Sequence, residues 1–344
     1  EKQQLLSNSD STDSSITEDD QFQPMLIYQQ PLTAIINLSN YALGTGVLAG
    51  SYTMSLQGYA LAPIMYLLFC CLTAVANYMM KKSIDHYHKF SYKGLLDYSY
   101  PKWIGYMEVV FHIIFNTGNL ISYTIVCKDN FFFFDKQDEG YNIRCAILMS
   151  VIMILIVMPL CFSKSLRHFL YCSYLEVLVM VFLVVALAMT YSSKQERPQL
   201  QAFKFNYKTL YALPMMAHSY STMQFSFIGI YKEVENREKN IFKITISCTA
   251  LIVLINFSTS FLGYFLYGDQ TFSNIVRNIS LEGTWISILI NFSMIVYVVT
   301  HTPVVVYNLR KVFEQIFFGQ NMVQRKWEII IAAVICIFVT AVGS

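Results

Sequence analysis

Residues 37–50 read NLSNYALGTGVLAG, in which three glycines and two asparagines interrupt an otherwise apolar segment. Glycine in a helix interior costs about 1 kcal/mol relative to alanine, so this cluster favours local unwinding. Irregular backbone at membrane depth is tolerated only where it is buried in protein or lines a cavity. The stretch therefore predicts a broken helix whose free backbone groups are available to a ligand.

The chain around this stretch has the composition of an integral membrane protein. Of its 344 residues, 55% are hydrophobic and 13% are charged, whereas soluble domains carry roughly 25% charged residues. Nine apolar segments are each long enough to cross the hydrocarbon layer, and their length and lack of alternation favour helices over barrel strands. They run over roughly 32–53, 58–80, 103–126, 144–162, 168–191, 207–230, 243–267, 284–306 and 327–344.

The ends of the chain suggest its domain organisation. Residues 1–31 are polar and acidic, which predicts a disordered cytoplasmic tail rather than an export signal. Residues 32–344 would form one transmembrane domain. With a cytoplasmic N-terminus, about two thirds of the 24 Lys and Arg residues lie inside, as the positive-inside rule requires. Since the ninth segment ends at Ser344 without flanking polar residues, we expect a truncated sequence.

Charge and cysteine patterns narrow the function. A net charge of +2 is too small to indicate a nucleic-acid partner. The sequence contains no convincing catalytic constellation, so an enzyme is not expected, and no CxxC motif or Cys/His cluster suggests a metal site. Cys127 and Cys145 flank a predicted external loop, but the sequence does not determine whether they form a disulfide.

A second interrupted segment lies five helices further on. Residues 211–222 read YALPMMAHSYST, where Pro214 removes a backbone hydrogen bond and five polar side chains follow. Interrupted segments at matching positions of two repeats indicate a binding site between them. We expect Ser219, Tyr220 and Ser221 to shape its pocket. Two simpler interpretations stay open: the glycines form a helix-packing face, and Pro214 is a kink.

The eighth segment supplies a third candidate region, because residues 300–303 read THTP. The hydroxyls of Thr300 and Thr302 suit a hard cation such as sodium, whereas the imidazole of His301 suits a proton. Further ionisable side chains stand in other apolar segments, where such groups are costly and often functional. They are Glu108, His112 and Glu176.

Together these stretches resemble the sodium-coupled neutral amino-acid transporters of the system A and system N type, within the amino acid/auxin permease family. Residues 37–58 are similar to the first helix of that group, including Asn37, Asn40, Gly44 and Gly46. The resemblance extends over nearly the whole chain after the tail. Its other matching stretches are residues 116–128, 166–185, 211–233, 261–264 and 302–310.

The resemblance implies an all-α, LeuT-type inverted-repeat bundle, with nine helices present here and eleven when complete. It implies a secondary active transporter that moves neutral amino acids by symport with Na⁺ or H⁺, without another cofactor. Asn40, with Thr300 or Thr302, would coordinate the ion. The backbone of Gly44, Thr45 and Gly46 would hold the substrate carboxylate, aided by the helix dipole.

One departure from the family leaves the coupling ion open. The family usually has a threonine where this sequence has His301, which weakens the case for sodium coupling and strengthens the case for proton coupling. A transporter-like sensor that binds an amino acid and signals through its tail is the alternative function. A plasma-membrane location and a vacuolar or lysosomal one fit the sequence equally well.

Overall fold

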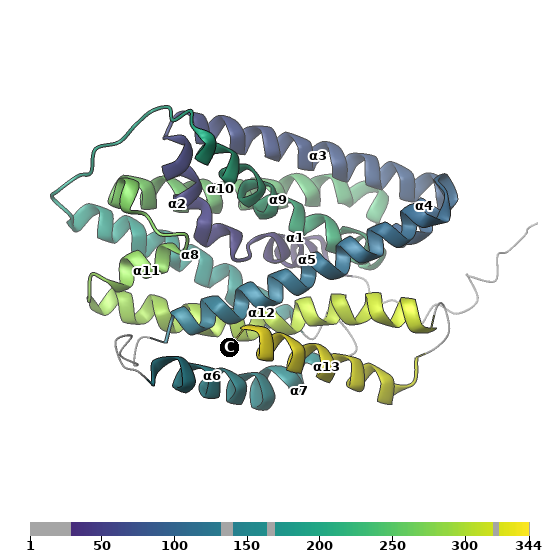
Figure 1. The fold of residues 1–344 in the computed structure, drawn as a ribbon. Helices are drawn as coiled ribbons and strands as arrows, with labels where there is room; N and C mark the ends of the chain where they lie inside the picture. Colours follow the sequence, from purple (N-terminus) through teal and green to yellow (C-terminus); the bar gives the residue numbers. More distant parts are fainter. Residues whose placement is uncertain (1–28, 132–139, 164–168, 319–322, 344) are drawn as a thin grey trace, which may run out of the picture.

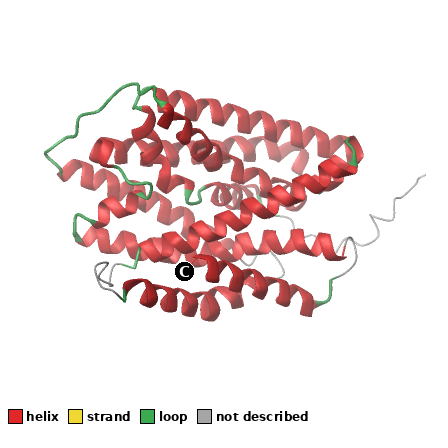
Figure 2. Cartoon of the chain, in the orientation of Figure 1, coloured by secondary structure: helices red, strands yellow, loops and turns green. Residues whose placement is uncertain are grey.

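The computed structural model describes residues 29–131, 140–163, 169–318 and 323–343, which form helices joined by loops (Figure 2). One isolated parallel β-bridge joins Gln29 to Val234. The long helices lie side by side in a single bundle, with α3 along one edge and α6 and α13 along the opposite one (Figure 1). The predicted all-helical class is therefore confirmed.

Helices account for most of the described chain in both its N-terminal and its C-terminal part. The first part of the chain forms α1 (Pro31–Ala42), α2 (Gly46–Gln57), α3 (Leu61–Tyr87), α4 (Tyr92–Ser99), α5 (Lys102–Asp129), α6 (Tyr141–Ile152), α7 (Met158–Cys161) and α8 (Leu170–Ser193). A π-helical turn, Met153–Val157, joins α6 to α7. The second part forms α9 (Tyr207–Glu233), α10 (Arg237–Tyr267), a 3₁₀ turn (Gly268–Gln270), α11 (Ile275–Ser280), α12 (Trp285–Phe318) and α13 (Arg325–Gly343).

The number of membrane spans differs from the predicted nine. Among the described residues, seven helices are long and apolar enough to cross a membrane, and the bent pair α1–α2 raises that number to at most eight. The predicted sixth segment does form a helix, α9, but α9 is not among those seven. Its polar side chains and Pro214 lower its apolar character, so its place in the bundle depends on packing rather than on hydropathy.

The tight contact between α2 and α10 fixes the second half of the broken segment. A Cβ added at Gly50 would lie 2.3 Å from Oγ of Ser260, and one added at Gly263 would lie 2.1 Å from Oγ of Ser51. The Ser51 hydroxyl also donates to the carbonyl of Thr259 at 2.8 Å. The packing-face interpretation therefore holds for Gly50.

The loop before α9 covers the link between α2 and α3. The backbone N–H groups of Tyr59 and Ala60 donate to the carbonyls of Gln201 and Ala202, at 3.1 and 2.9 Å. Gly58 there has φ +90°, and a Cβ would lie 2.5 Å from the Ala202 carbonyl oxygen, so both the backbone conformation and the close approach require glycine.

Two other predictions concern the N-terminal tail and the cysteines beside the external loop. Residues 1–28 of the predicted tail lie outside the described residues, and α1 begins at Pro31. Cys127 and Cys145 are both buried free thiols, so the possible disulfide is not formed in this structure.

Candidate functional site

The candidate site begins at the break between α1 and α2. Helix α1 ends at Ala42, α2 begins at Gly46, and the two helices are bent by 54°. The break places the carbonyl end of α1 and the amino end of α2 in the interior of the bundle. At the start of α2, where no preceding helical turn supplies carbonyls, the N–H groups of Val47 and Leu48 donate to the carbonyls of Gly44 and Thr45, both at 3.1 Å. The predicted unwinding within residues 37–50 is therefore confirmed.

A tyrosine from α12 stabilises the carbonyl end of the break. The Tyr297 hydroxyl donates to the backbone oxygen of Leu43 at 2.5 Å, and both residues are fully buried. An unsatisfied buried carbonyl is costly, so this bond compensates for a helical hydrogen bond that Leu43 cannot make.

Side chains from α5 and α9 approach the backbone between Gly44 and Gly46, just before and at the start of α2. A Cβ at Gly44 would lie 2.9 Å from the hydroxyl of Tyr123, and a Cβ at Gly46 would lie 2.5 Å from Oγ of Ser219. Ser122 donates to the Thr45 hydroxyl at 3.2 Å. Glycine at the break thus lets hydroxyl groups lie directly against backbone, the close approach that a small polar ligand would share.

The three predicted pocket residues of α9 lie in three different surroundings. Ser219 lies at the break, while Tyr220 packs its ring on that of Tyr66 in α3, with centroids 6.1 Å apart. Ser221 is only half-buried, because two helical positions rotate it about 200° away from Ser219. The structure therefore brings Gly44, Thr45, Gly46 and Ser219 together and leaves Ser221 outside.

The helix that carries these residues is continuous. Helix α9 runs from Tyr207 to Glu233 through Pro214, so the predicted second break is absent from this conformation and the kink interpretation fits better. The polar side chains after Pro214 reinforce the helix, since the hydroxyls of Ser219 and Thr222 donate to the carbonyls of Met215 and His218, at 3.2 and 2.7 Å.

Three polar residues, one each from α1, α8 and α12, meet about one helical turn before the break. Nδ1 of His301 lies 2.8 Å from Oε2 of Glu176, and Nδ2 of Asn40 donates to the same carboxylate oxygen. The side chains of Glu176 and His301 have an exposed fraction of 0%. We call Asn40, Glu176 and His301 the buried triad.

The buried triad retains unused hydrogen-bonding capacity. Oδ1 of Asn40, Oε1 of Glu176 and Nε2 of His301 have no hydrogen-bond partner among the described residues. The rings of Tyr123 and Tyr297 flank the imidazole, with centroids 5.1 and 5.2 Å away. These tyrosines also contact the break, so the triad and the break share two walls.

The predicted sodium ligands do not assemble. Thr300 donates to the carbonyls of Val296 and Tyr297, at 3.0 and 3.1 Å, and Thr302 donates to the carbonyl of Val298 at 2.7 Å. Both hydroxyls are thus used within their own helix. A carboxylate and an imidazole stand beside Asn40 instead, which does not fit the predicted sodium site.

In the sequence, Glu176 stands out only as an ionisable residue in an apolar segment. Its partners lie 136 and 125 positions away in the sequence, so no local motif could connect them. The available signal was the cost of a carboxylate at membrane depth, which requires a partner.

Comparison with known proteins identifies the family. A family described as transmembrane amino acid transporter protein matches residues 29–344. Two similar proteins of Arabidopsis thaliana are amino acid transporter AVT6E, 23% identical over 311 residues, and amino acid transporter AVT6B, 24% identical over 306 residues. The aligned regions cover 83% and 80% of this chain, but only 63% and 66% of those relatives.

The chain therefore belongs to the transmembrane amino acid transporter family. This membership confirms the broad resemblance seen in the sequence and the expectation that the protein is an integral membrane protein rather than an enzyme. The chain spans slightly less than two thirds of the length of the two relatives.

Proposed function

We propose that this chain moves neutral amino acids across a membrane by symport with protons, in a LeuT-type bundle whose N-terminus is cytoplasmic. The observation that carries the proposal is the position of the helix break beside the buried triad, because α1 contributes to both. Gly44 belongs to the break and Asn40 to the triad, one helical turn apart. A movement of α1 that follows ligand binding at the break would therefore also move Asn40 in the buried triad. The plasma membrane and a vacuolar or lysosomal membrane both remain compatible.

The break suits the common part of every amino acid. The positive end of the α2 dipole favours a carboxylate near Gly44, Thr45 and Gly46, although the N–H groups of Val47 and Leu48 already donate to the carbonyls of Gly44 and Thr45, both at 3.1 Å. Besides Tyr297, the side chains that reach the break are Tyr123, Ser122 and Ser219. All four bring a hydroxyl group, and none carries a charge. This lining supports a neutral substrate.

The buried triad suits a proton as the coupling ion. An imidazolium beside a carboxylate is neutral overall, whereas a neutral imidazole beside the ionised Glu176 leaves one negative charge fully buried. The pair therefore offers a proton two acceptor atoms, Nδ1 of His301 and Oε2 of Glu176, which lie 2.8 Å apart and are closed to solvent. Asn40 donates to the same carboxylate, so the charge of Glu176 acts on the last turn of α1 before the break.

The test is uptake of a radiolabelled neutral amino acid into proteoliposomes, with a proton gradient and a sodium gradient imposed separately. We expect a proton gradient alone to drive accumulation. Glu176→Gln should abolish accumulation and retain amino-acid exchange, because the amide cannot carry the charge that the proton neutralises. Glu108→Gln is the matched control, since Glu108 forms a partly exposed pair with His112 at 3.3 Å; it should retain uptake.

Two results would contradict this mechanism. Sodium-driven uptake that His301→Gln leaves intact would assign coupling to sodium after all. Amino-acid binding without accumulation under either gradient would favour the alternative function, a sensor that signals through its tail.

The contacts of Gln29, in the predicted tail, are the observation that supports the sensor as a second candidate function. The backbone N–H of Gln29 donates to the carbonyl of Glu233 at 2.6 Å, and the N–H of Glu235 donates to the carbonyl of Gln29 at 3.1 Å. The side chain of Asn37 in α1 donates to that of Gln29 at 3.1 Å. Gln29 is thus hydrogen-bonded both to α1 and to the end of α9. A movement of α1 at the break would therefore displace Gln29.

A further inference from the structure

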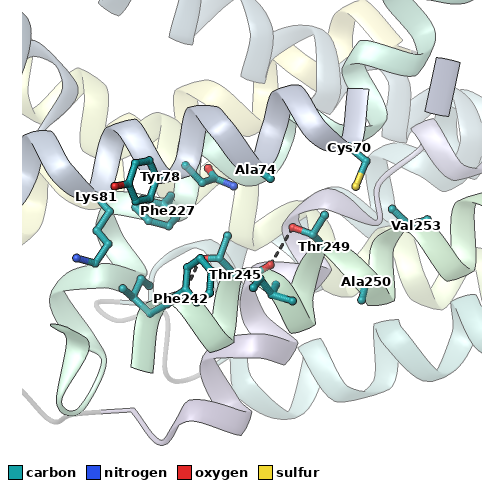
Figure 3. Close-up of a pocket in the computed structure, with 13 residues that line it drawn as sticks. Cys70, Ala74, Tyr78, Lys81, Phe227, Phe242, Thr245, Thr249, Ala250 and Val253 are labelled. Carbon is teal, nitrogen blue, oxygen red and sulfur yellow. Dashed lines mark hydrogen bonds between the residues drawn. The ribbon is translucent and has the colours of Figure 1, made fainter. Parts of the chain in front are cut away.

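A groove runs along the outside of the bundle between α3 and α10, with α9 as its floor (Figure 3). Its volume is about 360 Å³. Lys81 and Phe242 lie at one end, and Cys70 and Val253 lie at the other. The eleven residue-to-residue steps from Cys70 to Lys81 span about 16 Å of helix, roughly half the 30 Å thickness of the hydrocarbon layer. The groove is therefore about one leaflet deep.

The groove opens toward the region that lipid would occupy. Both α3 and α10 are among the helices able to cross a membrane, and Tyr78 and Phe242 at its rim are 58% and 60% exposed. Small side chains, Ala74 and Ala250, face it from opposite walls and create the hollow. A rigid apolar molecule lying parallel to the helices would fit this shape.

One polar side chain in the groove has no hydrogen-bond partner. Asn77 is 1% exposed, and neither Nδ2 nor Oδ1 of its amide has a partner among the described residues. Leaving a buried donor and acceptor unpaired is costly, more so at membrane depth. The amide therefore indicates a ligand that supplies both an acceptor and a donor at this point.

The other buried or half-buried polar groups of the groove are already used. The Thr245 and Thr249 hydroxyls donate to the carbonyls of Ile241 and Thr245, both at 2.8 Å. Lys81 pairs with Asp85 at 2.7 Å. Because Lys81 already has an anionic partner, the groove does not require a phosphate, and recognition rests on Asn77.

We propose that this groove binds a sterol. A single hydroxyl group accepts from Nδ2 of Asn77 and donates to Oδ1, satisfying both halves of the amide. The amide lies one helical turn, about 6 Å, deeper than Lys81, so the hydroxyl stands just inside the polar boundary. The ring system of the sterol then lies along Ala74 and Thr249 toward Cys70. Phe227 of α9 forms the floor beneath it. The site is separate from the helix break and does not depend on the proposed transport mechanism.

Binding is tested on the purified full chain in detergent with radiolabelled cholesterol, using unlabelled cholestane, which lacks the hydroxyl, and phosphatidylglycerol as competitors. We expect cholesterol to compete at least about tenfold better than cholestane, and phosphatidylglycerol not to compete. Asn77→Leu should weaken cholesterol binding to the level of cholestane. Ala74→Phe should block the groove, while Val75→Phe, on the exposed face of the same turn, should leave binding unchanged.

Equal competition by cholesterol and cholestane would overturn the proposal, since it would show an apolar surface without hydroxyl recognition. Effective competition by phosphatidylglycerol would overturn it in favour of a phospholipid.

Thermal unfolding separates a ligand site from a structural asparagine. Without sterol, Asn77→Leu should melt at or above the wild-type temperature, because it removes two unpaired buried atoms. Added cholesterol should raise the melting temperature of the wild type and not that of the variant. If Asn77→Leu lowers the melting temperature equally with and without cholesterol, Asn77 is structural and the sterol site does not exist.

Discussion

The two interrupted segments of this chain, α1–α2 and α9, have similar sequence signals and different structures. Three glycines in the first produce a break and a 54° bend, whereas Pro214 in the second lies inside a continuous helix. The difference is in what surrounds them. The break has Tyr297 to bond the Leu43 carbonyl, while the hydroxyls of α9 bond their own helix. A helix opens where its neighbours supply the hydrogen bonds that it gives up.

Replacement of a glycine at the break should have the largest effect. The methyl group of Gly46→Ala would lie 2.5 Å from Oγ and 3.1 Å from Cα of Ser219, and overpacking of this kind costs about 1–3 kcal/mol. We expect uptake to fall at least about tenfold. Gly229→Ala in α9 is the control, since a methyl group there meets nothing within 4 Å among the described atoms. An equal loss of uptake in Gly46→Ala and Gly229→Ala would contradict the distinction between the α1–α2 break and α9.

Removing the hydroxyl that stabilises the break should have the next largest effect. Tyr297→Phe leaves the buried Leu43 carbonyl without its 2.5 Å bond, a cost of about 1–3 kcal/mol. We expect a lower melting temperature and a raised KM for uptake. Tyr220→Phe is the matched control, because its buried hydroxyl has no hydrogen-bond partner in the described part of the chain. A larger effect at Tyr220 than at Tyr297 would contradict this account.

A substitution in α9 tests whether its continuity matters for function. Pro214→Ala restores an N–H that can bond within the helix and removes a residue that costs up to about 3 kcal/mol in a helix interior. We expect a higher melting temperature and uptake within about twofold of the wild type. A strong loss of uptake in a stabilised protein would show that α9 opens at Pro214 during transport, which would restore the symmetry between the segments.

The smallest effect is expected at the hydroxyls of α12. Thr300→Val removes a group that donates to carbonyls of its own helix, so uptake under a proton gradient should stay within about twofold. Asn40→Ala is the contrast, because it removes a donor to Glu176 and should impair coupling. If Thr300→Val instead abolishes a sodium-dependent uptake, the hydroxyl is an ion ligand and the proton mechanism is wrong.

Several features of the site could be predicted from the sequence because their causes are local. The glycines of residues 37–50 weaken a helix wherever it lies, so the break at Leu43–Thr45 was predictable. Ser219, predicted from the interrupted segment after Pro214, lies beside Gly46 at that break. Ser221 does not lie beside the break, because helical rotation in the continuous α9 turns it away from Ser219, and the sequence around Pro214 did not show that α9 stays continuous.

Other features depended on partners distant in the sequence. Thr300 and Thr302 have the chemistry of sodium ligands, yet their hydroxyls bond within α12. Glu176 carried no motif, and its role in the buried triad became visible only when α1, α8 and α12 came together. The partner of a buried polar group is set by packing, which the order of residues along one helix does not specify.

The sequence alone determined that this is an all-helical membrane protein, because a chain with 55% hydrophobic residues in long runs must satisfy its backbone internally within lipid. It also determined where the first helix breaks and, through the family resemblance, the family. The tertiary structure decided which interruption becomes a break, which polar groups pair, and which one, Asn77, stays unpaired among the described residues. These outcomes depend on hydrogen bonds and contacts between helices far apart in the chain, and only the packed bundle specifies them.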